Sequence, residues 1–345
     1  MRIRDLAVGL TAALAALAVV TTAEAGGKPK AQGKGKGGKK APAAAPRPQP
    51  RFSLQPLEGS TDPVAIGNGG QVGMSRHVAS AGGQQIMTAL AWAAGQVTPL
   101  ESPDGQMSQI HDVHPDGTMV GMAAHHAVIW RGGKLIDLTP GMLWAEARAI
   151  NAAGVVIGNF RRTSADVDKC FQWSGGVFIE LPLPGCSDIN AAGQVLGGGQ
   201  IWSTKGVIKL QQPPGLERYG AMYLNDDGIV AGTVFMGLRG GGDRPFIWSK
   251  DGKTATRLHD QAGEVRGINA KGQIIGRTGV QGDLGAVMWE GGKMVALEDL
   301  IAERDWHLVD ALGINDQGQI IGRAYVGKGG NDKRKERAFV LTPLP

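Results

Sequence analysis

The chain has 345 residues, a length that allows one large domain or two ordinary ones. Glycine contributes 55 residues without a collagen-like period, 42% of the residues are hydrophobic, and only two are cysteine. These values exclude a collagen, a wholly disordered chain, a cysteine-rich disulfide scaffold and a four-cysteine metal site. The many glycines, eight tryptophans and few charges instead predict short strands joined by tight turns.

The first 25 residues have the pattern of an export signal. Arg2 and Arg4 precede an apolar stretch at 6–20, and Ala-Glu-Ala at 23–25 has the small residues of a signal-peptidase site. An uncleaved anchor is the alternative, but a spanning helix needs about 20 apolar residues. We therefore predict a signal peptide at 1–25, a periplasmic or extracellular location, and no transmembrane segment in the mature chain.

Residues 26–51 form a basic segment rich in Lys, Gly and Pro. It carries six Lys, two Arg and no acid, and residues 1–25 are neutral overall, so residues 52–345 have a net charge of −3. The composition predicts a disordered linker, because it offers nothing to bury. Two interpretations stay open: the linker binds anionic surfaces through its charge, or it is a spacer.

The strongest pattern is a unit of about 40 residues that occurs seven times in 52–345. Clear copies are INAAGVVIG at 150–158 and INAKGQIIG at 268–276, each followed by an apolar run that ends in Trp and by a glycine turn with another apolar run. In this pattern the Asn side chain caps a hairpin turn and the Gly adopts a positive φ. The turn asparagines are Asn151, Asn190, Asn225, Asn269 and Asn315.

These motifs resemble the HAF family of bacterial extracellular repeats. The resemblance rests on A-x-x-I-N-x-x-G-Q-I-x-G, then A-F-x-W, then G-G-x-x-x-x-L, and it covers nearly all of 52–345. It implies an exported repeat protein and brings no settled biochemical activity. The departures are Gly67 and His114 at the Asn position, and Leu341 where Trp is expected.

Each unit supplies four short strands, termed a to d, and four strands per repeat are typical of a β-propeller blade. We predict an all-β fold, a β-propeller of seven four-stranded blades over 52–345. The last unit stops after strand c at Leu341, and FSLQPLEG at 52–59 is similar to the strand-d segments of other units. The N-terminal strand should therefore complete the seventh blade and leave no open edge.

The b–c and d–a loops vary in length and lie at one end of the strands, so they form the predicted ligand face. The candidate residues on this face are Arg161, Arg162, Asp166, Asp168, Arg239, Asp243, Arg244, Asp305 and His307. The basic run at 333–337 is open to two interpretations, an anion patch or a solvated loop.

Cys170 and Cys186 are 16 residues apart, and an oxidising compartment favours a disulfide between them over free buried thiols. Four histidines fall in one unit and raise the question of a metal site, with turn and surface roles as the alternative: His111, His114, His125 and His126. No catalytic motif, cofactor site or metal site is predicted.

The favoured functional hypothesis is a monomeric binding or scaffold module for an envelope or extracellular partner, either a polymer or a protein. The alternative is an exported enzyme that acts on polysaccharide or peptide at the variable loop face. A structural surface repeat is the third hypothesis. Fold alone does not decide among them.

Overall fold

The computed structural model describes residues 48–58, 62–79, 83–103, 106–213, 219–235, 242–279, 285–327 and 335–345, without the side chains of Tyr219 and Ala221. The predicted signal peptide, most of the predicted linker, Arg239, Lys333 and Arg334 lie outside these residues. In the described part of the chain, no helix has the length and apolar character needed to cross a membrane.

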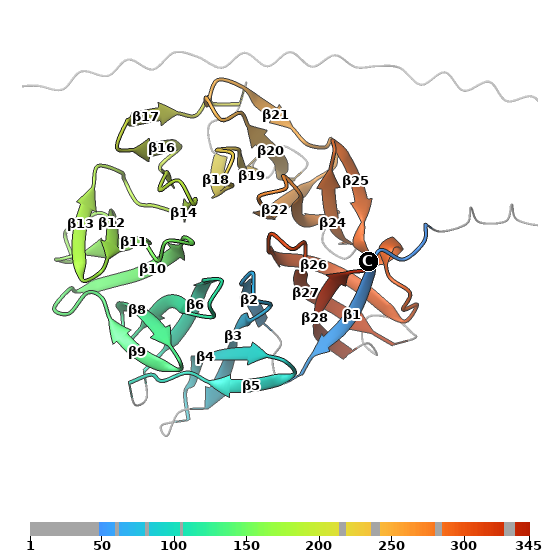
Figure 1. Ribbon diagram of the computed structural model, residues 1–345, viewed down its shortest axis with the longest axis horizontal. Helices are drawn as coiled ribbons and strands as arrows, with labels where there is room; N and C mark the ends of the chain where they lie inside the picture. Colours follow the sequence, from blue (N-terminus) through green and yellow to red (C-terminus); the bar gives the residue numbers. More distant parts are fainter. Residues whose placement is uncertain are drawn as a thin grey trace, which may run out of the picture. The chain divides into compact units, whose positions relative to one another are not determined.

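The described residues form seven antiparallel sheets of four strands, which confirms the predicted seven-bladed propeller (Figure 1). Blade 1 consists of β2 (Asp62–Ile66), β3 (Val72–Ala79), β4 (Gln85–Ala93) and β5 (Gln96–Pro99). Blade 2 consists of β6 (Ser108–Val113), β7 (Met119–Ala123), β8 (His126–Arg131) and β9 (Lys134–Asp137). Blade 3 consists of β10 (Trp144–Ile150), β11 (Val156–Arg161), β12 (Lys169–Ser174) and β13 (Val177–Leu181).

Blade 4 consists of β14 (Asp188–Ile189), β15 (Val195–Gly197), β16 (Gln200–Ser203) and β17 (Gly206–Lys209). Blade 5 consists of β18 (Tyr219–Leu224), β19 (Val230–Val234), β20 (Arg244–Trp248) and β21 (Ala255–Arg257). Blade 6 consists of β22 (Gly263–Ile268), β23 (Ile274–Thr278), β24 (Gly285–Glu290) and β25 (Lys293–Ala296). Blade 7 consists of β26 (Trp306–Ile314), β27 (Ile320–Val326), β28 (Lys335–Pro343) and β1 (Phe52–Leu57), and the short 3-10 helix η1 (Leu297–Leu300) precedes it.

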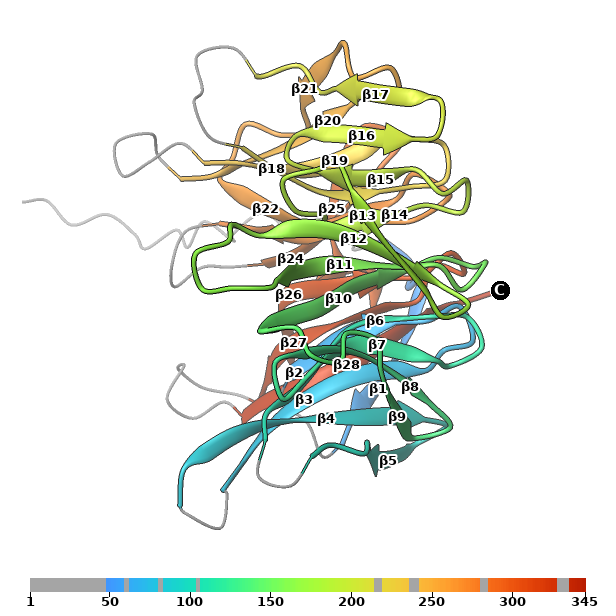
Figure 2. The ribbon, with the colours of Figure 1, turned by 90° about the vertical axis from the view of Figure 1, so that its left-hand side faces the viewer.

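The inner strands of the blades surround one axis. Contacts connect β2, β6, β10, β14, β18, β22 and β26 in sequence, and β26 contacts β2 again, so the cycle is closed. The side view shows successive blades following one another around this axis (Figure 2).

The N-terminal strand closes the ring as predicted. Strand β1 pairs antiparallel with β28 from Phe52 opposite Pro343 to Leu57 opposite Ala338. Phe52 and Leu57 are buried in the cores on either side of blade 7. The outer strand of the last blade therefore comes from the start of the propeller, and the last unit needs no fourth strand of its own.

The repeated tryptophans pack between blades. Trp130 and Trp248 are fully buried, and their indole N–H groups donate hydrogen bonds to Glu101 O at 2.6 Å and Gln211 O at 2.8 Å. Both acceptors lie in segments that arrive from the preceding blade. Leu341, which stands at this position in blade 7, is also fully buried, so a packed apolar side chain suffices there.

The glycine that ends the Q-I-x-G motif is required by close packing within a blade. A Cβ atom on Gly276 would collide with the carbonyl oxygen of Glu264 on the neighbouring strand, and one on Gly322 would collide with that of Asp310. Strand a approaches strand b so closely at this point that no side chain fits.

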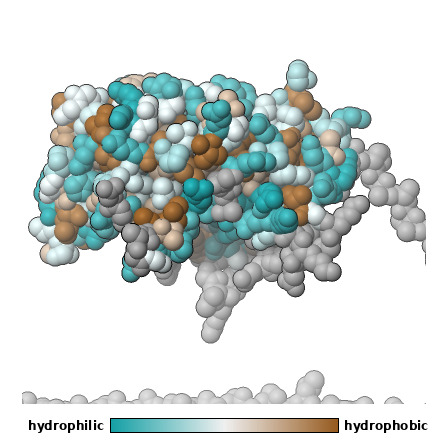
Figure 3. Space-filling model, turned by 90° about the horizontal axis from the view of Figure 1, so that it is seen from below, coloured by the Kyte–Doolittle hydropathy of each residue, from teal (hydrophilic) through white to brown (hydrophobic). Residues whose placement is uncertain are grey.

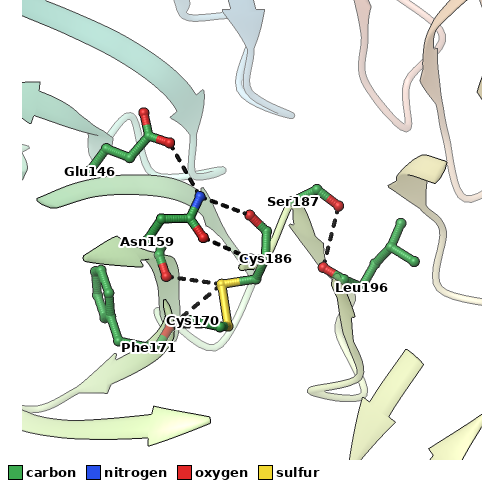
Figure 4. The surroundings of a disulfide bond; sticks show 8 residues. Glu146, Asn159, Cys170, Phe171, Cys186, Ser187 and Leu196 are labelled. Atoms are coloured by element: carbon green, nitrogen blue, oxygen red, sulfur yellow. Dashed lines mark hydrogen bonds between the residues drawn. A yellow bond between two sulfur atoms is a disulfide. The ribbon is translucent and has the colours of Figure 1, made fainter. Parts of the chain in front are cut away.

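Cys170 in β12 and Cys186, just before β14, form a disulfide that joins blade 3 to the start of blade 4 (Figure 4). Beside it, the Asn159 amide nitrogen donates to Cys186 O and to Glu146 Oε1, both at 3.2 Å, and Asn159 Oδ1 accepts from Cys186 N at 2.7 Å. Asn159 thus connects the disulfide to Glu146 on the inner strand of blade 3.

We expect the double variant Cys170→Ala/Cys186→Ala to lose about 3 kcal/mol of unfolding free energy. The bond closes a loop with a sequence separation of 16 residues, and a closed loop of that size restricts the unfolded chain by about this amount. Urea unfolding followed by tryptophan fluorescence measures the change. Equal unfolding free energies for the variant and the oxidised wild type would contradict the expectation.

Candidate functional site

The turn asparagines form hydrogen bonds from blade to blade around the axis. Each side-chain nitrogen donates to the backbone oxygen at the same position of the next blade, with N···O distances of 3.0–3.3 Å. The side-chain oxygens accept backbone N–H groups of their own turns. The donors and acceptors run from Asn151 to Asn190, Asn225, Asn269, Asn315 and finally Gly67.

The two departures from Asn have local reasons. A Cβ atom on Gly67 would lie 2.9 Å from His114 O, so the contact between blades 1 and 2 is made by closely packed backbone. His114 lies next to blade 3, and its Nε2 is 3.2 Å from Ala152 O. His114 therefore makes a link between blades at the position where five other units use Asn.

A β-bulge in the inner strand directs one residue toward the axis in six of the seven blades. Six inner strands have a register shift at the third residue before the turn position. Ser187 has the corresponding position in blade 4. These seven residues, called the channel ring below, are Val64, His111, Arg148, Ser187, Met222, Arg266 and Leu312. Bulges commonly redirect a side chain next to a functional site.

The channel ring lines a cavity of about 410 Å³ on the axis of the propeller. This volume falls in the range of small-molecule sites, about 300–1,000 Å³. Tyr223, Asp112 and Asp188 also line the cavity, together with neighbouring residues of the inner strands. The cavity therefore combines charged, hydroxyl and apolar groups from all seven blades.

Two carboxyl groups of this cavity join neighbouring blades. Asp112 accepts hydrogen bonds from Val113 N at 2.7 Å and from Ile150 N of blade 3 at 2.9 Å. Asp188 accepts from the amide of the residue that follows it, at 2.8 Å, and from Leu224 N of blade 5 at 2.7 Å. Burial raises the pKa of Asp112, and it raises the pKa of Asp188 to about 7.

We expect Asp188 to make the stability of the protein depend on pH between about 4 and 7. The folded state keeps a proton on Asp188 in this window, whereas the unfolded carboxyl has a pKa of 3.8 and releases it. The unfolding free energy should therefore fall as the pH rises, by at most about 1.4 kcal/mol per pH unit, and level off above pH 7. Urea unfolding of wild type and Asp188→Asn at several pH values isolates this contribution. Asp227→Asn, at an exposed position of the turn in the next blade, is the control. If the unfolding free energies of wild type and Asp188→Asn differ by the same amount at every pH, Asp188 does not cause the pH dependence.

The end of the axis toward the b–c loops contains paired acids and arginines from blades 6 and 7. Glu264 accepts a hydrogen bond from Arg277 at 2.5 Å and forms an ion pair with Arg266, with an N···O distance of 2.9 Å. Asp310 is 1% exposed and lies 3.5–3.7 Å from guanidinium nitrogens of Arg266, Arg277 and Arg323. Burial raises the pKa of Asp310 and the three arginines oppose that rise. The cluster holds two carboxyl groups, those of Glu264 and Asp310, among three guanidinium groups and links blades 6 and 7.

The residues predicted for the ligand face fall into three groups in blades 3, 5 and 7. In blade 3, Arg161 pairs with Asp168 at 2.9 Å, Arg162 pairs with Glu180 at 3.0 Å, and Asp166 accepts two amides of its own loop. These hydrogen bonds lower the pKa of Asp166.

In blade 5, Arg244 donates to the backbone oxygens of Gly242 and Asp243 at 2.6 and 3.2 Å. In blade 7, His307 Nδ1 is 2.8 Å from Glu298 Oε2, and Asp305 O accepts from a loop amide. The partners identified for these residues lie within their own loops or adjoining segments, and the cavity described above lies on the axis instead.

The histidines of blade 2 likewise have separate partners. His111 Nδ1 is 2.7 Å from Ala147 O, and His126 Nδ1 is 2.6 Å from Asp137 Oδ2. Within the described ranges, no group of three or more His, Cys, Asp or Glu side chains is arranged to hold a metal ion.

Sequence reasoning missed the channel ring and the two carboxyl groups that link blades. A signal for the ring exists: the third residue before the turn position has six residue types in seven units, whereas the residue just before the turn position is Ile, Val or Leu in every unit. A weaker signal for the carboxyl groups is Asp two residues before the turn position, in Asp112-Val-His and Asp188-Ile-Asn.

Comparisons with known proteins establish the fold. No protein-family model matches the chain, and no curated protein matches it. Among solved structures, the β-propeller domain of the Trilobed protease from Pyrococcus furiosus is 12% identical, with a TM-score of 0.52, over 84% of this chain and 93% of that one. An acylaminoacyl peptidase in complex with Z-Gly-Gly-Phe-chloromethyl ketone is 13% identical, with a TM-score of 0.51, over 84% of this chain. The chain spans about half the length of that peptidase, 52%, and at these identities the likeness shows the β-propeller fold alone.

Proposed function

We propose that this protein is an exported β-propeller binding module whose partner is a component of the cell envelope or the extracellular space. The export part rests on the signal-peptide pattern at 1–25. The propeller is the scaffold, and part of the partner enters the cavity on its axis.

The channel ring carries this proposal. The frame of the propeller repeats the same residues from blade to blade, whereas the channel ring has six residue types at seven equivalent positions. A rigid frame that presents variable side chains to one cavity is the usual arrangement of a binding site.

The outer surface and the carboxyl groups of the cavity also support a binding site on the axis. On the face shown in Figure 3, hydrophobic residues are scattered among hydrophilic ones and do not gather in one large area. Asp112 and Asp188, the acids of the cavity, have both oxygens in hydrogen bonds to backbone amides. These features favour a binding site on the axis over an enzyme with a carboxylate pair.

Co-sedimentation with isolated cell envelopes tests the proposal. Residues 26–345 and residues 48–345, which keep all seven blades and β1, are compared over a salt series. We expect both forms to bind at about 0.15 M salt, with the basic segment adding a contribution that fades as salt rises. If only the longer form binds and salt abolishes the binding, the basic segment is the anchor and the proposal for the propeller fails.

A further inference from the structure

We infer that the cavity on the axis binds a small organic anion, or the anionic group of a larger partner, through carboxylate or phosphate oxygens. This inference deepens the proposed function and rests on it. The charged and titratable members of the channel ring are all basic: His111 and Arg148 in neighbouring blades, and Arg266 three blades further on. Basic groups thus face the cavity from two sides.

The arginines have hydrogen-bond donors to spare. The Nη1 atom of Arg148 lies 3.7 Å from Glu146 Oε1, which is beyond hydrogen-bond distance, and its guanidinium forms no hydrogen bond within the described part of the chain. Arg266 binds Glu264 through Nη2, but its buried Nε–H has no partner among the described residues. Guanidinium groups with unused donors are the groups that bind carboxylate and phosphate oxygens most strongly.

The acids that line the cavity do not cancel these charges. The carboxyl oxygens of Asp112 and Asp188 are directed to backbone amides of their own and the following blade. Burial raises the pKa of both, and for Asp188 it raises the pKa to about 7, so that carboxyl group carries less negative charge near neutral pH. The acids beside these arginines, Glu146 at Arg148 and Glu264 and Asp310 at Arg266, are not part of the cavity lining.

The other members of the channel ring indicate a ligand with an apolar part. Val64, Met222 and Leu312 offer aliphatic surface between the basic groups, and the cavity of about 410 Å³ excludes a folded protein domain. Apolar contacts around a few placed polar groups are typical of small-molecule sites. An organic anion fits this lining better than a bare inorganic ion.

Isothermal titration of the purified protein tests the inference with four probes: citrate, glycerol phosphate, putrescine and glucose. We expect at least one of the two anions to bind with a Kd below about 1 mM, and the cation and the sugar not to bind. Citrate alone points to carboxylate ligands and glycerol phosphate alone to phosphate ligands. Arg148→Gln and Arg266→Gln should each weaken binding about tenfold or more.

Arg131→Gln is the matched control, because Arg131 is exposed at the end of β8, away from the cavity lining, and its variant should bind like wild type. Circular dichroism and thermal unfolding establish that each variant is folded. Anion binding that is equal in all variants, or no anion binding up to about 10 mM, would overturn the inference. Binding of putrescine or glucose alone would also overturn it, yet would leave the proposed binding function of the cavity in place. Failure of envelope binding is measured separately and concerns the proposed function.

Discussion

A chain that begins at Glu58, and so lacks β1, is expected to lose more than about 5 kcal/mol of unfolding free energy and to self-associate. Deletion removes the buried side chains of Phe52 and Leu57, and burial losses of this kind cost about 3–5 and 2–5 kcal/mol. It also leaves β28 as an open edge, where another chain can pair. Urea unfolding and size-exclusion chromatography measure the two effects.

A chain that begins at Pro48 is the control for this deletion. It lacks the signal peptide and almost all of the basic segment, but it keeps β1 and Arg51, whose N–H donates to Leu300 O and whose carbonyl accepts from Leu344 N. We expect its stability to equal that of the longer form. If the chain from Glu58 unfolds at the same urea concentration as the chain from Pro48, closure by β1 does not stabilise the propeller.

Asn269→Ala should cost about 3 kcal/mol of unfolding free energy, because it removes four hydrogen bonds at one buried position. Asn269 accepts from two amides of its turn and donates to Gln273 Oε1 and to Asn315 O of the next blade. A buried group left without its partner costs about 1–3 kcal/mol. Chemical unfolding monitored by tryptophan fluorescence gives the value.

Asn269→Asp separates the turn from the link between blades. The aspartate keeps an oxygen for the turn amides but cannot donate to Asn315 O, so we expect a loss of about 2 kcal/mol or more. Lys271→Ala, at an exposed position of the same turn, is the matched control and should change stability by less than about 0.5 kcal/mol. Full tolerance of the aspartate would show that the Asn acts only in its own turn.

The propeller could be predicted from the sequence because its frame repeats. The turn pattern, the terminal Trp of strand c and the glycine spacing recur in most units, and the segment at 52–59 matches the strand that the last unit lacks. Each of these features is local or depends on comparing units along one chain. The pairing of β1 with β28 follows from that comparison.

The candidate site on the axis could not be predicted in the same way because its contacts cross between blades. The amide that Asp188 binds belongs to Leu224, 36 residues further along the chain, and nothing in the sequence joins the two. Strict alternation along a strand also fails at a β-bulge, so it does not show that Arg148 and Arg266 face the axis. The departures at Gly67 and His114 become understandable only beside their neighbouring blades.

The partners of the residues on the predicted ligand face also required coordinates. Loop length and polar composition singled out residues such as Arg161 and Arg162, and the structure shows them paired with Asp168 and Glu180. Exposed ion pairs of this kind contribute little energy and leave fewer groups for a ligand. Sequence composition identifies polar loops, whereas the partners of each charge require coordinates.

The most direct test of the channel as the binding site is to fill it. Leu312→Trp places a large side chain at a cavity-lining position, and Val207→Trp places the same side chain on the exposed outer strand β17 as the control. In the envelope co-sedimentation assay with residues 48–345, we expect Leu312→Trp to reduce binding about tenfold or more and Val207→Trp to leave it unchanged. Equal binding by Leu312→Trp and wild type, with both proteins folded, would show that the partner does not enter the channel.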